Sequence, residues 1–270
     1  MLDKKHIKYF KKILPVDFVL SEEGDCWAYG YDNSKMHVMP ECVLFADSKA
    51  QIKDIVRYCF ENTIPITTRG RGTGNTGGSV PIENSVVLSL EKMNKIIDID
   101  ISNRLAVVQP GVINKTLQDE LQKENFFWGP DPSSQDYSTI GGNIANNSAG
   151  PRAIKYGTPR DNILGLEFIS GTGEIHKTGV KTSKGVVGLD LTRLFVGSEG
   201  VLGILSEATL KILPLNNSVK TFEITFETLK SASDMIIMLM TQPITPYKLE
   251  FVDEQSVKLI NSIKKIILKL

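Results

Sequence analysis

The alternation of apolar and polar positions early in the chain predicts a strand, a helix and a second strand in succession. Residues 42–46 form an apolar run of the length of a short buried strand. Ser48 and Gln51 have the spacing of a capping box at the start of a helix, and Pro65 marks the end of that helix. Residues 64–68 are predicted to be an extended strand. Between these signals, apolar residues recur three and four positions apart and so share one helix face. The predicted buried face consists of Ile52, Ile55, Val56, Cys59 and Phe60.

The middle of the chain has the pattern of short strands joined by turns. Apolar and β-branched runs are separated by turn residues at the spacing of hairpins. The tract 138–157 is dense in Gly, Asn, Ser and Ala, and we expect it to be loop-like. The predicted elements are strands at 85–90 and 205–212, hairpins with arms at 96–101 and 105–109 and at 166–170 and 174–177, and a helix at 115–124. This mixture indicates an α+β fold class.

The composition changes after Pro214, and we expect a second domain to begin there. Its predicted elements are strands at 221–226 and 248–252, and helices at 231–240 and from Glu254 onward. The last helix has an apolar stripe without a stop signal, formed by Val257, Ile260, Ile263, Ile267 and Leu270. We therefore expect three parts: an N-terminal segment at 1–39, a main domain at 40–215, and at 216–270 the beginning of a truncated second domain.

Charge and cysteine content exclude several classes of protein. Lys+Arg 31 and Asp+Glu 31 balance in the 270 residues, so binding to nucleic acid or another polyanion is not expected. The longest apolar run, 235–240, is far shorter than the ~20 residues of a membrane helix, and the charged start lacks the core of a signal peptide. Three widely spaced cysteines predict neither a disulfide framework nor a zinc ribbon, so we expect a cytoplasmic protein.

The segment RGRGTGNTGG at 69–78 is the first candidate for binding chemistry. Gly72, Gly74 and Gly77 spell G-x-G-x-x-G, but the extended chain that follows disfavours the Rossmann arrangement, in which a helix opens at the loop. Bare backbone N–H groups can instead surround a pyrophosphate as a nest, with charge added by Arg69 and Arg71. A flexible surface turn is the alternative interpretation.

Two further small-residue tracts extend this picture. The tract from Ser138 to Gly157 offers polar side chains between glycines, and GSEGVLGI at 197–204 is a glycine-punctuated turn that enters a strand. Each of them alone is compatible with an ordinary loop. Three such loops on an α+β chain favour one long cofactor that lies across all of them.

These motifs resemble the FAD-linked oxidase family that includes p-cresol methylhydroxylase and vanillyl-alcohol oxidase. The ordered set T-R-G-x-G-T-G, PDPSS, IGGN, KYG and GSEG-x-LG carries the resemblance, which covers about residues 40–255. Within this family, the sequence most resembles the 2-hydroxy-acid branch, represented by the glycolate oxidase D subunit and D-lactate dehydrogenase. The resemblance implies two α+β subdomains that enclose FAD, followed by a substrate-covering cap domain.

The resemblance also implies which residues hold FAD. For the pyrophosphate these are Arg69, Gly70, Arg71, Gly72, Thr73, Gly74, Asn75, Thr76, Gly77 and Gly78. For the flavin and ribityl region they are Pro130, Asp131, Ser134, Thr139, Gly141, Gly142 and Asn143, followed by Asn146, Gly150, Tyr156 and Gly157. Near the adenosine they are Glu199, Gly200, Val201 and Ile204. Some members of the family hold flavin covalently through a His or Cys in the binding loops. Neither RGRGTGNTGG nor the PDPSS tract contains one of these residues, so we expect noncovalent FAD.

The implied activity is hydride transfer from a small 2-hydroxy acid to flavin N5. A catalytic base is not evident, because His6, His37 and His176 lie in segments typical of surface histidines, and no metal site is predicted. Three hypotheses stay open: a complete small flavoenzyme, a flavin-binding module without catalysis, and a flavoenzyme like the UDP-sugar reductase that uses NADPH. Further oxidase subunits or self-association through the last helix are the expected partners.

Overall fold

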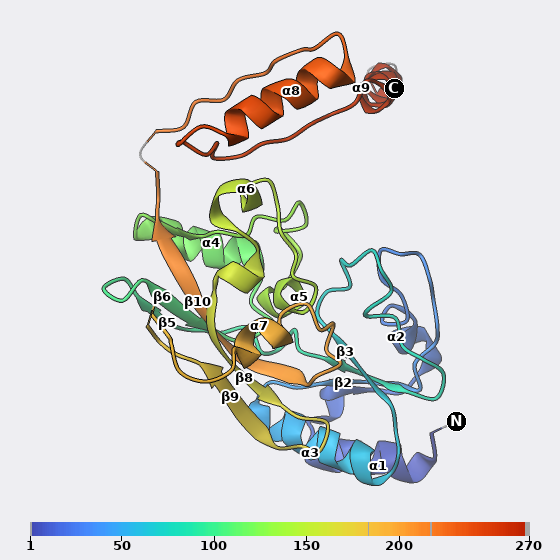
Figure 1. Ribbon diagram of the computed structural model, residues 1–270. Helices are drawn as coiled ribbons and strands as arrows, with labels where there is room; N and C mark the ends of the chain where they lie inside the picture. The colour runs from blue at the N-terminus through green and yellow to red at the C-terminus, as the bar shows by residue number, and fades with distance from the viewer. Residues whose placement is uncertain (1, 183, 217, 268–270) are drawn as a thin grey trace.

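The computed structural model describes residues 2–182, 184–216 and 218–267, with side chains described as far as residue 263. Two β-sheets form its body, and the C-terminal segment lies apart from both of them above α6 (Figure 1). This mixed helix and sheet content agrees with the α+β class. Within the described ranges, no helix is both long and apolar enough to cross a bilayer.

The smaller sheet is built around the predicted strand, helix and strand. Its order is β1-β2-β4-β3, in which β2, β4 and β3 are parallel and β1 is antiparallel. α1 and α3 lie together against one side of this sheet (Figure 1) and bury its main core. The elements are α1 (Lys4–Ile13), η1 (Val16–Phe18), β1 (Val19–Leu20), α2 (Glu23–Trp27), β2 (Cys42–Phe45), α3 (Lys49–Glu61), β3 (Ile66–Arg69) and β4 (Val86–Ser89).

The larger sheet is antiparallel and has the order β5-β6-β10-β8-β9, with β7 paired to the end of β10. The completely buried Trp128 of β7 anchors its core and donates from Nε1 to the Asn162 carbonyl over 3.3 Å. Both predicted hairpins are confirmed. The elements are β5 (Ile96–Asp100), β6 (Leu105–Val108), α4 (Asn114–Lys123), β7 (Phe126–Trp128), α5 (Ile140–Ala145), α6 (Ala153–Tyr156), η2 (Pro159–Asp161), β8 (Ile163–Ile169), β9 (Ile175–Gly179), α7 (Leu191–Phe195) and β10 (Ile204–Pro214).

The two sheets are joined by shared packing and by one buried carboxylate. Ile169 and Ile204 of the larger sheet belong to the core of the smaller one. Glu167 on β8, 3% exposed, accepts from Lys49 of α3 over 3.1 Å and from Ser206 over 3.0 Å, and it pairs with Lys177 over 3.1 Å. The sheets are therefore fixed relative to each other, and loops from both can line one site.

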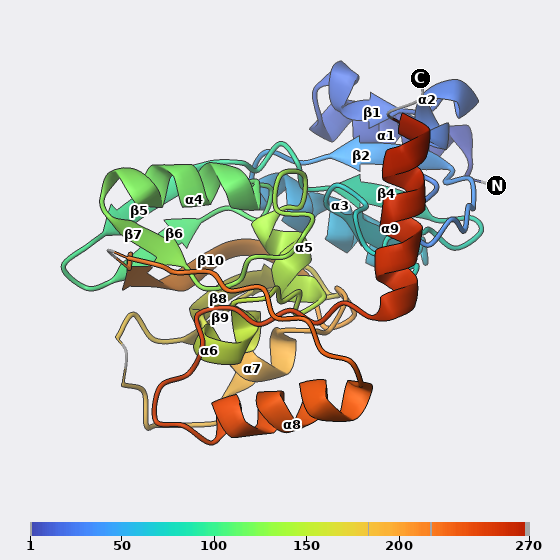
Figure 2. The same ribbon diagram turned by 90° about the horizontal axis from the view of Figure 1, so that it is seen from above.

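The C-terminal segment differs from the sequence prediction. Its helices are α8 (Leu229–Met240) and α9 (Glu254–Ile267), which run in different directions in Figure 2. The strands predicted at 221–226 and 248–252 are wrong, because neither segment pairs with another strand of the described chain to complete a hydrogen-bonded ladder. Val257, Ile260 and Ile263 are each about half exposed. Leu270 and the side chain of Ile267, the last members of the predicted stripe, lie outside the described residues.

Three local predictions need correction. Phe60 is 62% exposed, because at 100° per residue it lies about 80° around α3 from Ile52, at the edge of the buried face. The predicted capping box is absent: Ser48 makes no side-chain cap, and the Gln51 amide oxygen accepts from the Asp47 N–H over 2.8 Å. The tract 138–157 contains α5 and α6 and is not simply a loop.

Candidate functional site

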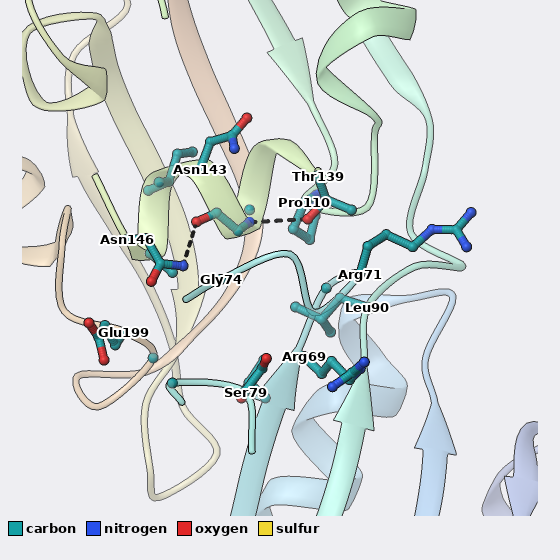
Figure 3. A pocket seen from close by; sticks show the side chains of 18 of the residues that line it. Arg69, Arg71, Gly74, Ser79, Leu90, Pro110, Thr139, Asn143, Asn146 and Glu199 are labelled. Carbon is teal, nitrogen blue, oxygen red and sulfur yellow. Dashed lines mark hydrogen bonds between the residues drawn. The ribbon is translucent and has the colours of Figure 1, made fainter. Parts of the chain in front are cut away.

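The glycine loop at 70–79 follows β3 directly and faces α5 across an open cleft (Figure 3). The cleft encloses about 970 Å³ of empty space, part of which is open to solvent. Its walls come from both subdomains: the loop after β3, α5, and the turn that precedes β10. The sequence-predicted residues that line it are Arg69, Gly70, Arg71, Gly72, Thr73, Gly74, Gly78, Ser134, Thr139, Gly141, Gly142, Asn143, Asn146, Glu199 and Gly200.

The backbone N–H groups of this loop are not used in hydrogen bonds within the described protein. Among the described residues, none of the N–H groups at 71–79 donates to a backbone carbonyl or a side chain. Only carbonyls of the loop are used: Gly74 accepts from the Asn33 N–H over 2.9 Å and Gly77 from the Val80 N–H over 3.0 Å. Successive free N–H groups can bind an anion such as phosphate, and six of these residues, at 71–74, 78 and 79, line the cleft.

Gly72 and Gly74 are glycines for different reasons. At Gly72, φ is +65° and a Cβ would meet the Arg69 guanidinium, so the fold itself requires glycine. At Gly74, φ lies outside the left-handed region, and a Cβ would find only one atom within 4 Å, Asp32 Oδ2 at 3.8 Å. Nothing in the fold excludes a side chain at Gly74. A bound group that approaches the backbone closely would explain its absence.

The two arginines of the loop make different contacts with the protein. Arg69, 6% exposed, donates to the Tyr31 carbonyl over 2.5 Å and to the Ala28 carbonyl over 3.5 Å. Burial lowers the pKa of its guanidinium, which stays charged, whereas burial and Glu91 raise the pKa of neighbouring Tyr29 to about 12. Arg71 pairs with Glu91 over 3.6 Å, and in Figure 3 its guanidinium points away from Gly74. Arg69 therefore directs its hydrogen bonds to the protein, whereas the Arg71 side chain is 55% exposed and only loosely paired.

In the second glycine tract, which begins at Ser138, the backbone N–H groups already donate to other groups of the protein. Ile140 and Gly141 donate to the carbonyls of Val112 and Pro110, each over 2.8 Å, and the Gly142 N–H donates to Thr139 Oγ1 over 3.1 Å. The Asn143 side chain, 2% exposed, accepts from Asn114 over 2.9 Å and donates to Ser138 over 3.1 Å. α5 is therefore a rigid wall of the cleft whose own hydrogen bonds are already made.

The turn at 197–203, which precedes β10, is hydrogen-bonded to α5 and lies next to the glycine loop. Gly197 and Glu199 donate to the carbonyls of Ile144 and Ala145 over 3.0 and 2.9 Å. Glu199 has a φ of +52°, and a Cβ on Gly78 would lie 3.0 Å from its Oε2. All three small-residue tracts thus meet at one place, as the hypothesis of a single long cofactor requires.

The remaining predicted residues do not line the cleft. Asp131, 5% exposed, accepts from the Arg152 N–H over 3.0 Å and pairs with Lys248 over 2.8 Å, which attaches the C-terminal segment to the PDPSS loop. Tyr156 contacts Tyr247 edge to face at 5.7 Å. The predicted residues outside the cleft lining are Asn75, Thr76, Gly77, Pro130, Asp131, Gly150, Tyr156, Gly157, Val201 and Ile204.

Sequence reasoning missed several lining residues. Asp32, which comes from the segment between α2 and β2, is the most notable because it is an acidic residue that is only 3% exposed. Its sequence neighbourhood has no periodic or motif signal that could have indicated it. The other missed residues are Thr68, Ser79, Leu90, Pro110, Ile144, Ala145, Ser148, Phe195, Gly203 and Leu205. In the described part of the chain, no three His, Cys, Asp or Glu side chains are grouped to hold a metal ion.

Comparison with solved structures identifies the fold. A structure of p-cresol methylhydroxylase with substrate bound superposes with a TM-score of 0.69 at 24% identity, over 79% of this chain and 44% of that chain. Alkyldihydroxyacetonephosphate synthase superposes with a TM-score of 0.72 at 22% identity, over 81% of this chain and 45% of that chain. The arrangement of two α+β subdomains is therefore that of the p-cresol methylhydroxylase type.

Curated relatives are more similar in sequence. Glycolate oxidase subunit GlcD of Bacillus subtilis is 41% identical over 239 residues, which are 88% of this chain and 51% of the relative. D-lactate dehydrogenase of Anaerostipes hadrus is 36% identical over 253 residues, 93% of this chain and 53% of the relative. The chain spans about half the length of these relatives.

A family model described as an FAD binding domain matches residues 40–179, which include the glycine loop and α5. The cleft fits this cofactor on independent grounds, since it offers free N–H groups for a pyrophosphate and an open backbone at Gly74. By the length and content of this match, the chain belongs to the FAD binding domain family.

Proposed function

We propose that this chain is the FAD-binding part of a 2-hydroxy-acid oxidoreductase and that the cleft holds FAD noncovalently. The observation that carries the proposal is the loop at 71–79, whose N–H groups have no acceptor among the described residues and whose Gly74 leaves room at the backbone. Noncovalent attachment is supported by the lining, which contains no His, Cys or Tyr among the described residues of the main cleft.

The substrate class follows from the relatives. One is named for glycolate and another for D-lactate, and both of these compounds carry a hydroxyl group on the carbon next to a carboxylate. Bound FAD would supply a hydride acceptor for oxidation of that carbon. The Bacillus relative is also named as a subunit, so we propose that further oxidase subunits cooperate with this chain.

In this proposal the residues of the chain divide the work of binding. The loop at 71–79 presents N–H groups to the pyrophosphate, while Arg69 holds that loop against the carbonyls of Tyr31 and Ala28. α5 and the turn at 197–203 form the opposite walls and exclude water from one side of the bound cofactor. Residues 216–270 would begin a separate substrate-covering domain, which Lys248 attaches to Asp131.

The first experiment measures FAD binding. Titration of FAD with the purified chain is expected to quench flavin fluorescence, and acid precipitation is expected to release all of the flavin into the supernatant. Yellow colour that stays in the pellet would contradict noncovalent attachment. A chain that neither contains nor binds FAD would refute the proposal.

The second experiment measures substrate oxidation. The described lining residues include no histidine or lysine, and the two carboxylates of the lining, Asp32 and Glu199, adjoin the glycine loop that we propose for the pyrophosphate, so acid–base help worth ~10²–10⁴-fold has no evident donor at the flavin. We therefore expect D-lactate, glycolate and D-2-hydroxyglutarate to bleach the flavin band only slowly under anaerobic conditions, at least ~100-fold below a turnover of ~10 s⁻¹. Bleaching at enzyme-like rates would show that the cleft is catalytically complete. Bleaching by NADPH alone would favour a reductase.

A further inference from the structure

Among the described residues that line the cleft, Asp32 is the carboxylate whose burial has no explanation within the protein. The residue is 3% exposed. Oδ1 accepts from the Ser34 N–H over 2.8 Å, whereas Oδ2 has no hydrogen-bond partner among the described residues. A buried carboxylate oxygen without a donor is costly, so an unfilled acceptor in a cleft indicates a missing donor.

The segment that carries Asp32 is fixed to the glycine loop. The Asn33 N–H donates to the Gly74 carbonyl over 2.9 Å, and its side-chain amide donates to Asn75 over 2.6 Å. Arg69 donates to the Tyr31 carbonyl on the other side of Asp32. These contacts hold the carboxylate in place, and Oδ2 lies 3.8 Å from the position that a Cβ on Gly74 would occupy.

The charges around Asp32 restrict what it can bind. The guanidinium of Arg69 acts on it electrostatically but directs its hydrogen bonds to Tyr31 and Ala28. A carboxylate repels a phosphate, so Oδ2 must face a hydrogen-bond donor beside the anion and not the anion itself. In a dinucleotide, the donors adjoining the pyrophosphate on either side are sugar hydroxyl groups.

We infer that Asp32 Oδ2 accepts a hydrogen bond from a sugar hydroxyl of the bound dinucleotide, next to the pyrophosphate held by residues 71–79. This inference rests on the proposed function. Asp32 also lines a second hollow with Thr73 and Ser134, so the hydroxyl can belong either to the ribityl chain or to the adenosine ribose. The loop and Asp32 then bind neighbouring parts of the dinucleotide: the N–H donors bind the phosphates, and the carboxylate accepts a hydrogen bond from a sugar hydroxyl.

The test compares Asp32→Asn and Asp32→Ala with the wild-type chain. Asn keeps the Oδ1 bond to Ser34 but removes the charged acceptor, and a charge-assisted hydrogen bond of this kind predicts a rise of about 10–100-fold in the dissociation constant for FAD. Asp98→Asn, an exposed carboxylate on β5 outside the cleft, is the control and is expected to leave FAD affinity unchanged. Displacement by ADP and by FMN then assigns the hydroxyl: a loss of ADP affinity indicates the ribose, and a loss of FMN affinity indicates the ribityl chain.

Thermal unfolding supplies a second readout. Because Oδ2 has no partner in the protein, Asp32→Asn is expected to unfold at the same or a higher temperature without FAD, and to show a smaller rise in Tm when FAD is added. Asp131→Asn removes a partnered buried carboxylate and is expected to lower the Tm without FAD. A lower FAD-free Tm for Asp32→Asn would show that the carboxylate is structural and would overturn the inference.

Three binding results would also overturn it. They are unchanged FAD affinity in both Asp32 variants, tighter FAD binding without the charge, and FAD binding that EDTA abolishes in the wild type but not in Asp32→Ala, which would indicate a bridging cation. A wild-type chain that binds no FAD would refute the proposed function as well. Wild-type binding that is insensitive to Asp32 refutes this inference alone.

Discussion

The loop at 70–79 and the tract at 138–150 look alike in composition but use their backbones in opposite ways. In the first, the N–H groups of 71–79 have no acceptor among the described residues, and Gly74 is open to the cleft. In the second, α5 satisfies its donors internally, and Gly141 and Gly150 press against Pro110 and Asp131. Glycine density therefore does not distinguish ligand binding from close packing. What distinguishes them is whether the backbone N–H groups already donate to acceptors within the protein.

The largest expected effect is on stability, in the second tract. A Cβ at Gly150 would lie 1.9 Å from the Asp131 carbonyl oxygen, far closer than two non-bonded atoms can approach. Because the clash is with backbone, Gly150→Ala should lower the free energy of unfolding by about 3 kcal/mol or more. Urea denaturation without FAD measures it. Gly171→Ala, in a turn where nothing lies within 4 Å, is the matched control, and equal stability of the two variants would break the comparison.

The next effect should fall on binding alone, in the first loop. A Cβ at Gly74 would have only Asp32 Oδ2 within 4 Å and would face the open cleft, so we expect the FAD-free Gly74→Val protein to unfold within about 0.5 kcal/mol of the wild type. The same side chain would block close approach to the backbone and raise the dissociation constant for FAD roughly 10–100-fold. Fluorescence quenching measures the affinity, with Gly171→Val as control. Unchanged affinity would mean that Gly74 is not part of the FAD site.

The two arginines sharpen the comparison by separating support of the loop from contact with the ligand. Arg69→Ala removes the anchor at the Tyr31 and Ala28 carbonyls and should weaken FAD about tenfold by loosening the loop. Arg71→Ala removes only an exposed pair with Glu91 and should change affinity by less than about threefold. Arg69→Lys, which lacks the planar fork, should recover little. Equal effects of the two alanine variants would contradict this division.

How far the sequence predicts the molecule depends on how local each signal is. The buried strand at 42–45, the helix face around Ile55 and both hairpins follow from short patterns and were predictable. The glycine tracts were found but not told apart, because the acceptors of Ile140 and Gly141 lie about thirty residues earlier, at Val112 and Pro110. Asp32 was not predictable, since its burial arises from contacts of its neighbours with Arg69 and Gly74.

The smallest expected effect tests whether stability and FAD affinity vary independently. Burial alone would raise the pKa of Glu167, but hydrogen bonds from Lys49, Lys177 and Ser206 hold it below its ordinary value. A carboxyl whose pKa is lower in the folded state stabilises the fold above its unfolded pKa of ~4.3, and this stabilisation is lost as the pH falls through the folded value.

Glu167→Gln should accordingly destabilise the protein by about 1–2 kcal/mol at pH 7, since both lysines are half exposed or more and their pairing is screened. The difference from the wild type should shrink as the pH is lowered below ~4. Glu167 joins the two sheets outside the cleft lining, so FAD affinity at pH 7 should stay within about twofold of the wild type. A large loss of affinity would show that the cleft depends on the joint between the sheets, and low affinity in a glycine variant would then no longer identify a direct contact with FAD.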